Sequence, residues 1–170
     1  FVATFEAFLG LLGFAIATGL FYGRFSRPRA YLKFSETAVV APFEEGSAIM
    51  FRVASYKNNM LSEAEVNITA AIEENIDGKL VSKFYQIETK QKKINSFSLN
   101  WTLVHKIDSN SPFYGFSEDD FKNTDIELII MIKAFDEVFA NTVVQRTSYI
   151  TPEIVYGARF LPMYHSSEDN

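Results

Sequence analysis

The first twenty-three residues are the feature that most constrains this chain. From Phe1 to Gly23 the run is apolar, and Glu6 is its only charged side chain. A helix of about 20 apolar residues covers the hydrocarbon core of a bilayer. Four basic side chains follow directly: Arg24, Arg27, Arg29 and Lys33. Positive charge beside a span marks its cytoplasmic end, so the sequence predicts a transmembrane helix followed by a cytoplasmic region.

Two other interpretations of the apolar run are weaker. A buried helix of a soluble protein normally shows amphipathic periodicity, which this run lacks. A signal peptide begins with a short charged segment and ends at a small-residue cleavage site, and the run has neither feature. The chain also starts without Met, so we expect it to be a piece of a longer protein.

The region from residue 31 to residue 170 has the size of one domain. It holds twenty acidic side chains (all but Glu6) and thirteen basic ones (all but Arg24, Arg27 and Arg29), a net charge of −7. A nucleic-acid-binding domain normally carries a basic face, so nucleic acid is excluded as a partner. The chain contains no cysteine, which excludes a disulfide scaffold and fits a reducing compartment.

Apolar and polar residues alternate with a period of two in several segments of this region. The clearest segment is 63–73, where one face carries Ala64, Val66, Ile68, Ala70 and Ile72. The segment 97–103 repeats the pattern with Phe97, Leu99, Trp101 and Leu103. Such alternation is typical of half-buried strands in an antiparallel sheet.

Turn and cap signals complete the fold prediction. Asp77-Gly78 predicts a tight hairpin between strands at 63–74 and 79–88. Ser117 predicts the cap of one short helix, with acidic residues in its first turn. The segment 126–132 is almost wholly apolar, so we expect a strand covered on both faces. Short strands at regular spacing favour a β-sandwich, so the predicted architecture is mainly β: a helix at 1–28 and a sandwich at 31–170.

No catalytic or metal-binding constellation can be assembled from the sequence. His105 and His165 are the only histidines, and no cysteine or HExxH-type motif completes a metal site around them. His105 continues the apolar face of 97–103, which favours a hydrogen-bonded histidine of a sheet. No nucleophile elbow and no phosphate-binding loop occurs. We therefore expect a protein that is not an enzyme and holds no metal.

The apolar helix carries two stripes of residues at helical spacing. One stripe consists of Ala7, Leu11, Phe14, Thr18 and Tyr22. The other consists of the small residues Ala15, Gly19 and Gly23, which permit close approach of another helix. The helix alone leaves open whether it lines a pore or only anchors and dimerises the protein.

Three segments of the soluble region closely resemble the cytoplasmic domain of inward-rectifier potassium channels. They are FRV at 51–53, SFSLNWTLVHKID at 96–108 and SPFYG at 111–115. The segments RTSY at 146–149 and EIVYGARF at 153–160 look like the strand after the gate loop of that family. The helix end GLFYGRFSRP at 19–28 is similar to the inner pore helix of its prokaryotic branch. The resemblance runs in order over most of the chain.

The resemblance implies a homotetramer in which four inner helices line a potassium pathway. Four immunoglobulin-like cytoplasmic β-sandwiches would continue that pathway as a vestibule, in the inner membrane of a bacterium. Potassium would be the permeant ion, and no cofactor is implied. We expect the family's outer helix, pore helix and TVGYG-type filter to lie before Phe1 and its last strand to lie beyond Asn170.

The resemblance also assigns roles to residues of the helix. Tyr22 falls at the aromatic plug of the helix crossing, and Phe14 falls where strongly rectifying members carry an acidic residue. Thr18 would face the pore together with them, and Gly10 and Gly19 would be hinges. Arg24, Arg27 and Arg29 match basic positions that meet phosphoinositide or other anionic headgroups, so membrane lipids are expected partners.

Two positions of the β-domain are assigned to the vestibule. Glu63 matches an acidic vestibule position, whereas a second acidic position is occupied by Lys133. Together with the uncharged Phe14, this departure predicts weak rectification. The segment Glu137–Val144 occupies the gate-loop region. The alternative to a channel is a membrane-tethered β-sandwich that binds a cytoplasmic partner.

Overall fold

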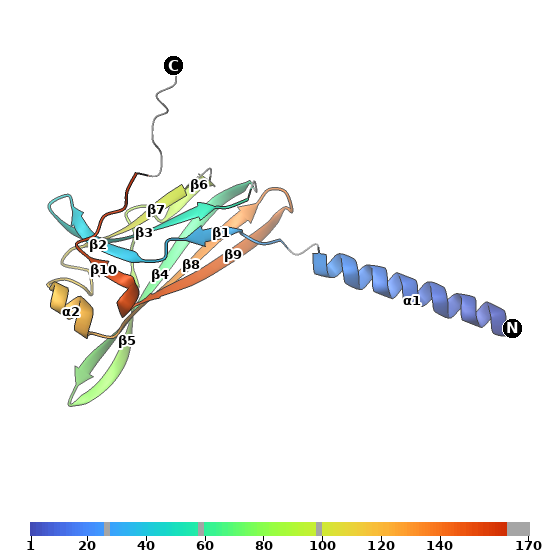
Figure 1. Cartoon of the computed structure of the whole chain (residues 1–170), viewed down its shortest axis with the longest axis horizontal. Helices are drawn as coiled ribbons and strands as arrows, with labels where there is room; N and C mark the ends of the chain where they lie inside the picture. Colours follow the sequence, from blue (N-terminus) through green and yellow to red (C-terminus); the bar gives the residue numbers. More distant parts are fainter. Residues whose placement is uncertain (26–27, 58–59, 98–99, 163–170) are drawn as a thin grey trace, which may run out of the picture.

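The structure, a computed structural model, describes residues 1–25, 28–57, 60–97 and 100–162. The helix α1 extends over Val2–Phe25, and Figure 1 shows it projecting from one end of a β-domain. None of its side chains is buried within the chain. Its length and composition suffice to cross a membrane. The helix was predicted over 1–28; it ends at Phe25, and residues 26–27 lie outside the described residues.

The described residues of the β-domain form two sheets of five strands each. The first sheet contains β1 (Leu32–Phe34), β2 (Ala38–Phe43), β3 (Gly46–Ser55), β7 (Asn100–Ile107) and β10 (Ile154–Tyr156). Its central strand is β3, which pairs with β7 on one edge and with β1 and β2 on the other. The short β10 joins β2 in parallel, and the other described pairs of this sheet are antiparallel.

The second sheet is built around the longest strand, β4. It contains β4 (Leu61–Ile76), β5 (Lys79–Ile87), β6 (Lys93–Phe97), β8 (Ile126–Asp136) and β9 (Asn141–Ile150). One edge of β4 pairs with β8, which in turn pairs with β9. The other edge pairs with β6 and then with β5, all antiparallel. The predicted β-sandwich after one transmembrane-length helix is confirmed.

The core lies between the two sheets and follows the alternation in the sequence. All five residues expected on the inner face of β4 are buried: Ala64, Val66, Ile68, Ala70 and Ile72. From the other sheet, Phe51 packs on Tyr149 of β9 with ring centroids 5.6 Å apart. The Tyr149 hydroxyl donates to the Ser35 carbonyl oxygen at 2.9 Å. Burying each large apolar side chain contributes about 1.5–3 kcal/mol, so these contacts dominate the stability of the sandwich.

The local turn and cap predictions are also confirmed. Asp77 and Gly78 form the two-residue turn between β4 and β5, with φ of 51° and 79°. Two positive φ angles are typical of the hairpin turn that Asp-Gly favours. The helix α2 (Glu118–Asn123) begins after Ser117, whose side chain and that of Asp120 form a reciprocal capping box. A single 3-10 turn (Thr151–Glu153) precedes β10.

Two strand predictions need correction. The segment 97–103 is not one strand, because Phe97 ends β6 in the second sheet whereas β7 begins at Asn100 in the first. The chain crosses between sheets there, and Leu99 lies outside the described residues. In β8, burial alternates along 126–132 instead of covering both faces. Ile129 and Met131 are only half-buried because none of the described residues forms a layer over the outer face of the second sheet.

Candidate pore-lining helix and charged sheet face

The predicted pore stripe of α1 is exposed along its whole length. Phe14 and Tyr22 are 72% and 75% exposed, and Thr18 lies between them at the spacing of one helical turn. The Thr18 hydroxyl donates to the Phe14 carbonyl oxygen at 2.8 Å, so it is already satisfied along the helix. An added Cβ at Gly10 or Gly19 would meet nothing within 4 Å. The pore-lining and hinge roles therefore depend on neighbouring helices and stay predictions.

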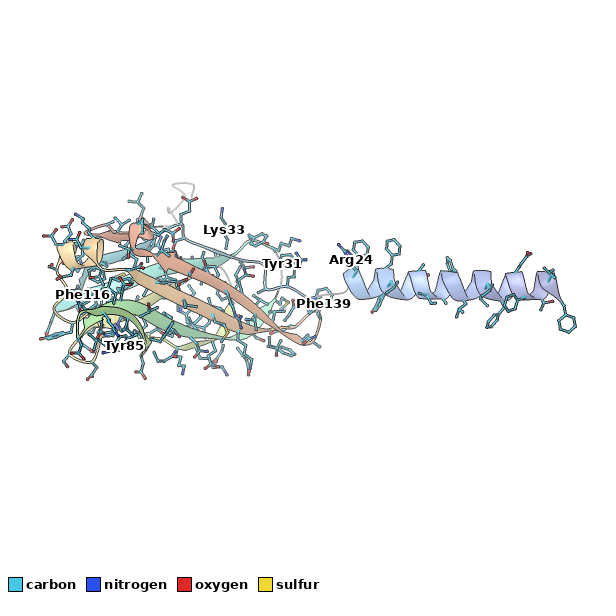
Figure 2. All side chains as sticks on the ribbon, turned by 90° about the horizontal axis from the view of Figure 1, so that it is seen from below. Arg24, Tyr31, Lys33, Tyr85, Phe116 and Phe139 are labelled. Carbon is cyan, nitrogen blue, oxygen red and sulfur yellow. The ribbon has the colours of Figure 1, made fainter. Side chains whose placement is uncertain are left out.

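The basic residues lie at the junction between α1 and the sandwich. Arg24 is in the last turn of α1, and Figure 2 shows it at the helix end nearest the β-domain. Arg24 and Arg29 are both exposed, and Arg27 lies outside the described residues. Lys33 is exposed on β1, which begins close by. Positive charge is thus present on both sides of the short connection, where an anionic headgroup could reach it.

The predicted vestibule residues belong to neighbouring strands of the second sheet. Glu63 lies in an irregular part of β4, between Ser62 and Glu65, and has a φ of 49°. Lys133 lies on β8 directly opposite Glu65. Both predicted residues are exposed, and neither is engaged in the sandwich core. The outer face of this sheet therefore presents charges of both signs.

Three further charged residues, which the sequence analysis did not predict as part of a site, lie beside Glu63 and Lys133. Glu65 is flanked by Lys93 on β6 and by Lys133 on β8 at the same level of the sheet. The Lys93 ammonium lies 3.6 Å from a carboxylate oxygen of Glu63, and the Lys92 ammonium lies 3.9 Å from Glu65. We call Glu63, Glu65, Lys92, Lys93 and Lys133 the charged row. Its lysines outnumber its glutamates, so the row carries no excess of negative charge.

The turn between β8 and β9 falls in the predicted gate-loop region. Asp136 is buried at the end of β8, and its carboxylate accepts hydrogen bonds from the backbone amides of Val138 (2.9 Å) and Phe139 (3.1 Å). Val138 and Phe139 are 65% and 51% exposed. Figure 2 places Phe139 at the end of the sandwich nearest α1. The buried Asp136 carboxylate thus fixes the conformation of the turn, in which the side chains of Val138 and Phe139 lie outside the core.

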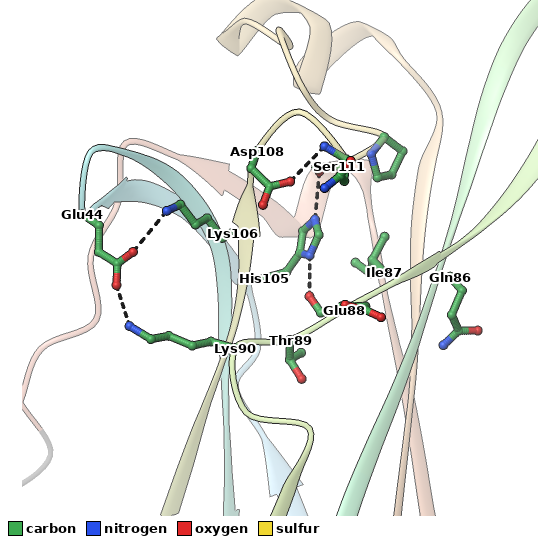
Figure 3. A pocket seen from close by; sticks show the side chains of 12 residues that line it. Glu44, Gln86, Ile87, Glu88, Thr89, Lys90, His105, Lys106, Asp108 and Ser111 are labelled. Carbon is green, nitrogen blue, oxygen red and sulfur yellow. Dashed lines mark hydrogen bonds and ion pairs between the residues drawn. The ribbon is translucent and has the colours of Figure 1, made fainter.

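A polar pocket of about 490 Å³ lies around His105 (Figure 3). The Nδ1 atom of His105 lies 2.6 Å from the Glu88 carbonyl oxygen, which can only accept, so Nδ1 carries the proton. The Nε2 atom then accepts from the Ser111 hydroxyl at 2.8 Å. Both ring nitrogens are engaged, which confirms a hydrogen-bonded sheet histidine. At the rim, Glu44 pairs with Lys90 and Lys106.

Burial determines the protonation of this histidine. It lowers the pKa of the His105 imidazole, and the hydrogen bond to the Glu88 carbonyl and the charge of Asp108 oppose this only in part. The described residues contain no group of three or more potential metal ligands. Both ring nitrogens of His105 are engaged in hydrogen bonds within the protein, so the side chain joins β7 to its neighbouring loops.

Comparison with known proteins gives the family. The model of the "Inward rectifier potassium channel C-terminal domain" matches residues 32–170. A curated relative, the inward rectifier potassium channel Kirbac3.1 of Paramagnetospirillum magnetotacticum, is 32% identical over 169 residues, which cover 99% of this chain. The chain belongs to the inward-rectifier potassium channel family. The resemblance to the prokaryotic branch is thereby confirmed, and the identity extends through α1.

The chain spans 57% of the length of Kirbac3.1, so the activity of a whole channel does not follow from the match. Among solved structures, the sporulation control protein Spo0M of Bacillus subtilis covers 78% of this chain and 51% of its own, with a TM-score of 0.37 and 11% identity. That similarity is too low to add to the argument. As a member of this family, the chain is a membrane protein with a β-sandwich after its helix.

We expect the stability of the β-domain to fall on acidification because of His105. Its folded pKa lies below the unfolded value of about 6.5, so the unfolded state binds more protons and stability rises with pH across that interval. Between about pH 7.5 and about pH 5.5 the melting temperature should drop by about 2–4 °C more in the natural protein than in His105→Gln. Thermal unfolding followed by circular dichroism at both pH values measures this. An equal drop in the two proteins contradicts the prediction.

Proposed function

We propose that this chain supplies the inner gate helix and the cytoplasmic vestibule of a tetrameric, inward-rectifier-type potassium channel in a bacterial inner membrane. The observation that carries the proposal is one relative, Kirbac3.1, that matches both α1 and the β-sandwich over 169 residues. A tethered binding module would need the sandwich but not a matching helix. The chain has no TVGYG-type sequence; in this proposal the selectivity filter is supplied by a segment of the full-length protein outside these residues.

A four-fold assembly would place the stripe that contains Phe14, Thr18 and Tyr22 around one axis. Closed cyclic symmetry is the usual way for identical subunits to surround one axis. Four copies of Tyr22 near that axis would form a hydrophobic constriction that excludes hydrated ions by sterics and dewetting. Phe14 and Thr18 would line the cavity above it, and Gly10 and Gly19 would allow the helix to bend. The sandwiches then lie on the cytoplasmic side.

The basic junction is the proposed contact with lipid. Arg24 lies in the last turn of α1, and Arg27 and Arg29 follow within five residues of the sequence. Each basic side chain beside anionic headgroups gains about 1 kcal/mol. The guanidinium group can bind a phosphate with two hydrogen bonds. Anionic phospholipid or phosphoinositide bound there would connect the membrane surface with the chain between α1 and the sandwich.

The charged row would face the vestibule and would not concentrate multivalent cations. Glu63 is balanced by Lys93, and Glu65 by its neighbouring lysines. In a wide vestibule these charges are also screened over a Debye length of about 8 Å. The deeper cavity has no charge at Phe14. We therefore propose a channel with weak block by internal magnesium or polyamine.

The channel proposal is tested on the full-length protein. Mass measurement in detergent should give a tetramer, and potassium-loaded liposomes should show flux. Replacing Tyr22 by Ala should raise that flux severalfold, because the constriction loses four rings, while Tyr114→Ala at an exposed tyrosine of the β-domain serves as a surface control. A monomeric or dimeric protein without flux would favour the tethered module. Unchanged flux in an assembled Tyr22→Ala channel would assign Tyr22 to the membrane interface instead.

Neutralising the basic junction tests the lipid proposal. The triple variant Arg24→Gln, Arg27→Gln, Arg29→Gln should lose most of the dependence of flux on anionic lipid, because about 1 kcal/mol per charge is removed. Flux is compared in liposomes with and without phosphatidylglycerol. The Lys79→Gln variant is a matched control, since Lys79 lies at the β4–β5 turn. A lipid dependence that survives the triple variant would leave these arginines with a role in topology only.

Introducing a charge into the cavity tests the prediction on block. Phe14→Asp should strengthen voltage-dependent spermine block by at least about tenfold, because a ring of charges in a confined cavity is much less screened than one in the vestibule. Phe14→Asn is the control for size and polarity. Electrophysiology in planar bilayers measures the block. Tight spermine block of the unmutated channel would show that Phe14 is misplaced or that Glu63 dominates the vestibule.

A further inference from the structure

The connection between α1 and the sandwich is very short. The helix ends at Phe25, and Ala30 is already buried in the core cluster with 1% exposure. Leu32, the first residue of β1, is 4% exposed. Only residues 26–29 therefore separate the helix from a chain that is anchored in the sandwich. Four residues extend over at most about 14 Å.

At the anchored end of this connection, Tyr31 has an uncommon backbone conformation. Its φ is 48°, in the left-handed region, which costs free energy in a residue that has a bulky side chain. Asp77 and Ala140 share this feature in hairpin turns, but Tyr31 lies at the entry to a strand. The left-handed residue changes the chain direction between buried Ala30 and β1. Surrounding contacts must compensate the cost.

Those contacts come from the end of β3 and the residues after it. The Tyr56 amide donates to the Tyr31 carbonyl oxygen at 3.1 Å, one step beyond the Leu32–Ser55 pair of the sheet. The two tyrosine rings meet edge to face, with centroids 5.8 Å apart and planes at 88°. The Lys57 ammonium lies 3.9 Å from the centroid of the Tyr31 ring. Edge-to-face rings and a cation over a ring face are both attractive arrangements.

We propose that Tyr31, Tyr56 and Lys57 form a junction clamp that fixes where the chain leaves the sandwich and so transmits a displacement of the β-domain to the end of α1. The clamp holds the chain at Tyr31, six residues after the end of the helix at Phe25. A displacement of the sandwich cannot be absorbed by slack in so short a connection. Tyr31 acts here as a positioning residue, and the coupling part of the inference rests on the proposed channel function.

Figure 2 supports the placement of this clamp. Tyr31 and Arg24 are labelled on facing ends of the sandwich and of α1, whereas Tyr85 and Phe116 lie at the far end of the β-domain. The clamp therefore lies at the end of the β-domain that is connected to α1, so a displacement of the β-domain reaches α1 through it. Arg29, a proposed lipid contact, lies between the clamp and the helix. Lipid bound at Arg29 would hold the same connection from the membrane side.

Proteolysis of the full-length protein in detergent tests the clamp without reference to ion flux. Trypsin cleaves after Arg29 only when Ala30 and Tyr31 leave the sandwich, because a protease needs an opened, extended segment. Tyr31→Val lacks the ring and disfavours the left-handed conformation, so cleavage after Arg29 should become about tenfold faster. Tyr31→Phe keeps both contacts and should cleave at the natural rate. Cleavage after Lys79, in the distant β4–β5 turn, is the internal control.

Two milder variants separate what the Tyr31 ring and the Lys57 cation contribute to the clamp. Tyr31→Asn tolerates the left-handed conformation but removes the ring, and Lys57→Met removes only the cation. Both should accelerate cleavage after Arg29, to a smaller extent than Tyr31→Val. If none of the three variants accelerates this cleavage relative to the Lys79 site, the clamp proposal is overturned.

Flux through the same proteins in liposomes tests the coupling. Tyr31→Val and Lys57→Met should change the potassium flux severalfold, while Tyr31→Phe should leave it unchanged. Faster cleavage with unaltered flux would overturn the coupling but keep the clamp. A natural protein that forms no conducting tetramer would overturn the proposed function and the coupling with it, and the cleavage rates would still decide whether the clamp exists.

Discussion

The packing of the two sheets against each other is the constraint on which the rest of the structure depends. Every second residue is buried from Ala64 to Ile72 of β4 and along β8, including Val66 and Ile130. Because side chains alternate across a strand, this burial also determines which residues face outward. A shift of one residue in register would bring charged side chains into the core, so the register is strongly specified. The charged outer face is a consequence of the apolar inner one.

The strand order of the second sheet also brings together charged residues that are distant in the sequence. Since β4 lies between β6 and β8, Glu65 has a lysine on each side, Lys93 and Lys133. The proposed vestibule wall is therefore balanced in charge as a property of the fold. Near α1, Ala30, which is buried, and Tyr31, whose φ angle is positive, connect the sandwich closely to the helix. A large β-domain and a membrane helix thus meet through a connection with little freedom.

Features that depend on neighbouring residues were predictable from the sequence. The Asp77-Gly78 turn, the Ser117 cap and the alternation of β4 are local, and each is confirmed. His105 was predicted as a hydrogen-bonded sheet residue because it continues an apolar face, although its partners Glu88 and Ser111 could not be named. The predicted single strand at 97–103 was wrong because an alternating pattern continues when a chain crosses from one sheet to the other.

By itself, the sequence determined that the chain has a membrane-length helix, a β-sandwich and the family features of an inward-rectifier potassium channel, because apolar length, period and motif are properties of contiguous residues. Only the tertiary structure decided which strands are neighbours and which charges meet. The pairing of Glu63 with Lys93 and the edge-to-face contact of Tyr31 with Tyr56 join segments that are distant in the sequence, and no local pattern predicts them. Such contacts follow from sheet order, which is set by the burial of the whole core and not by any one segment.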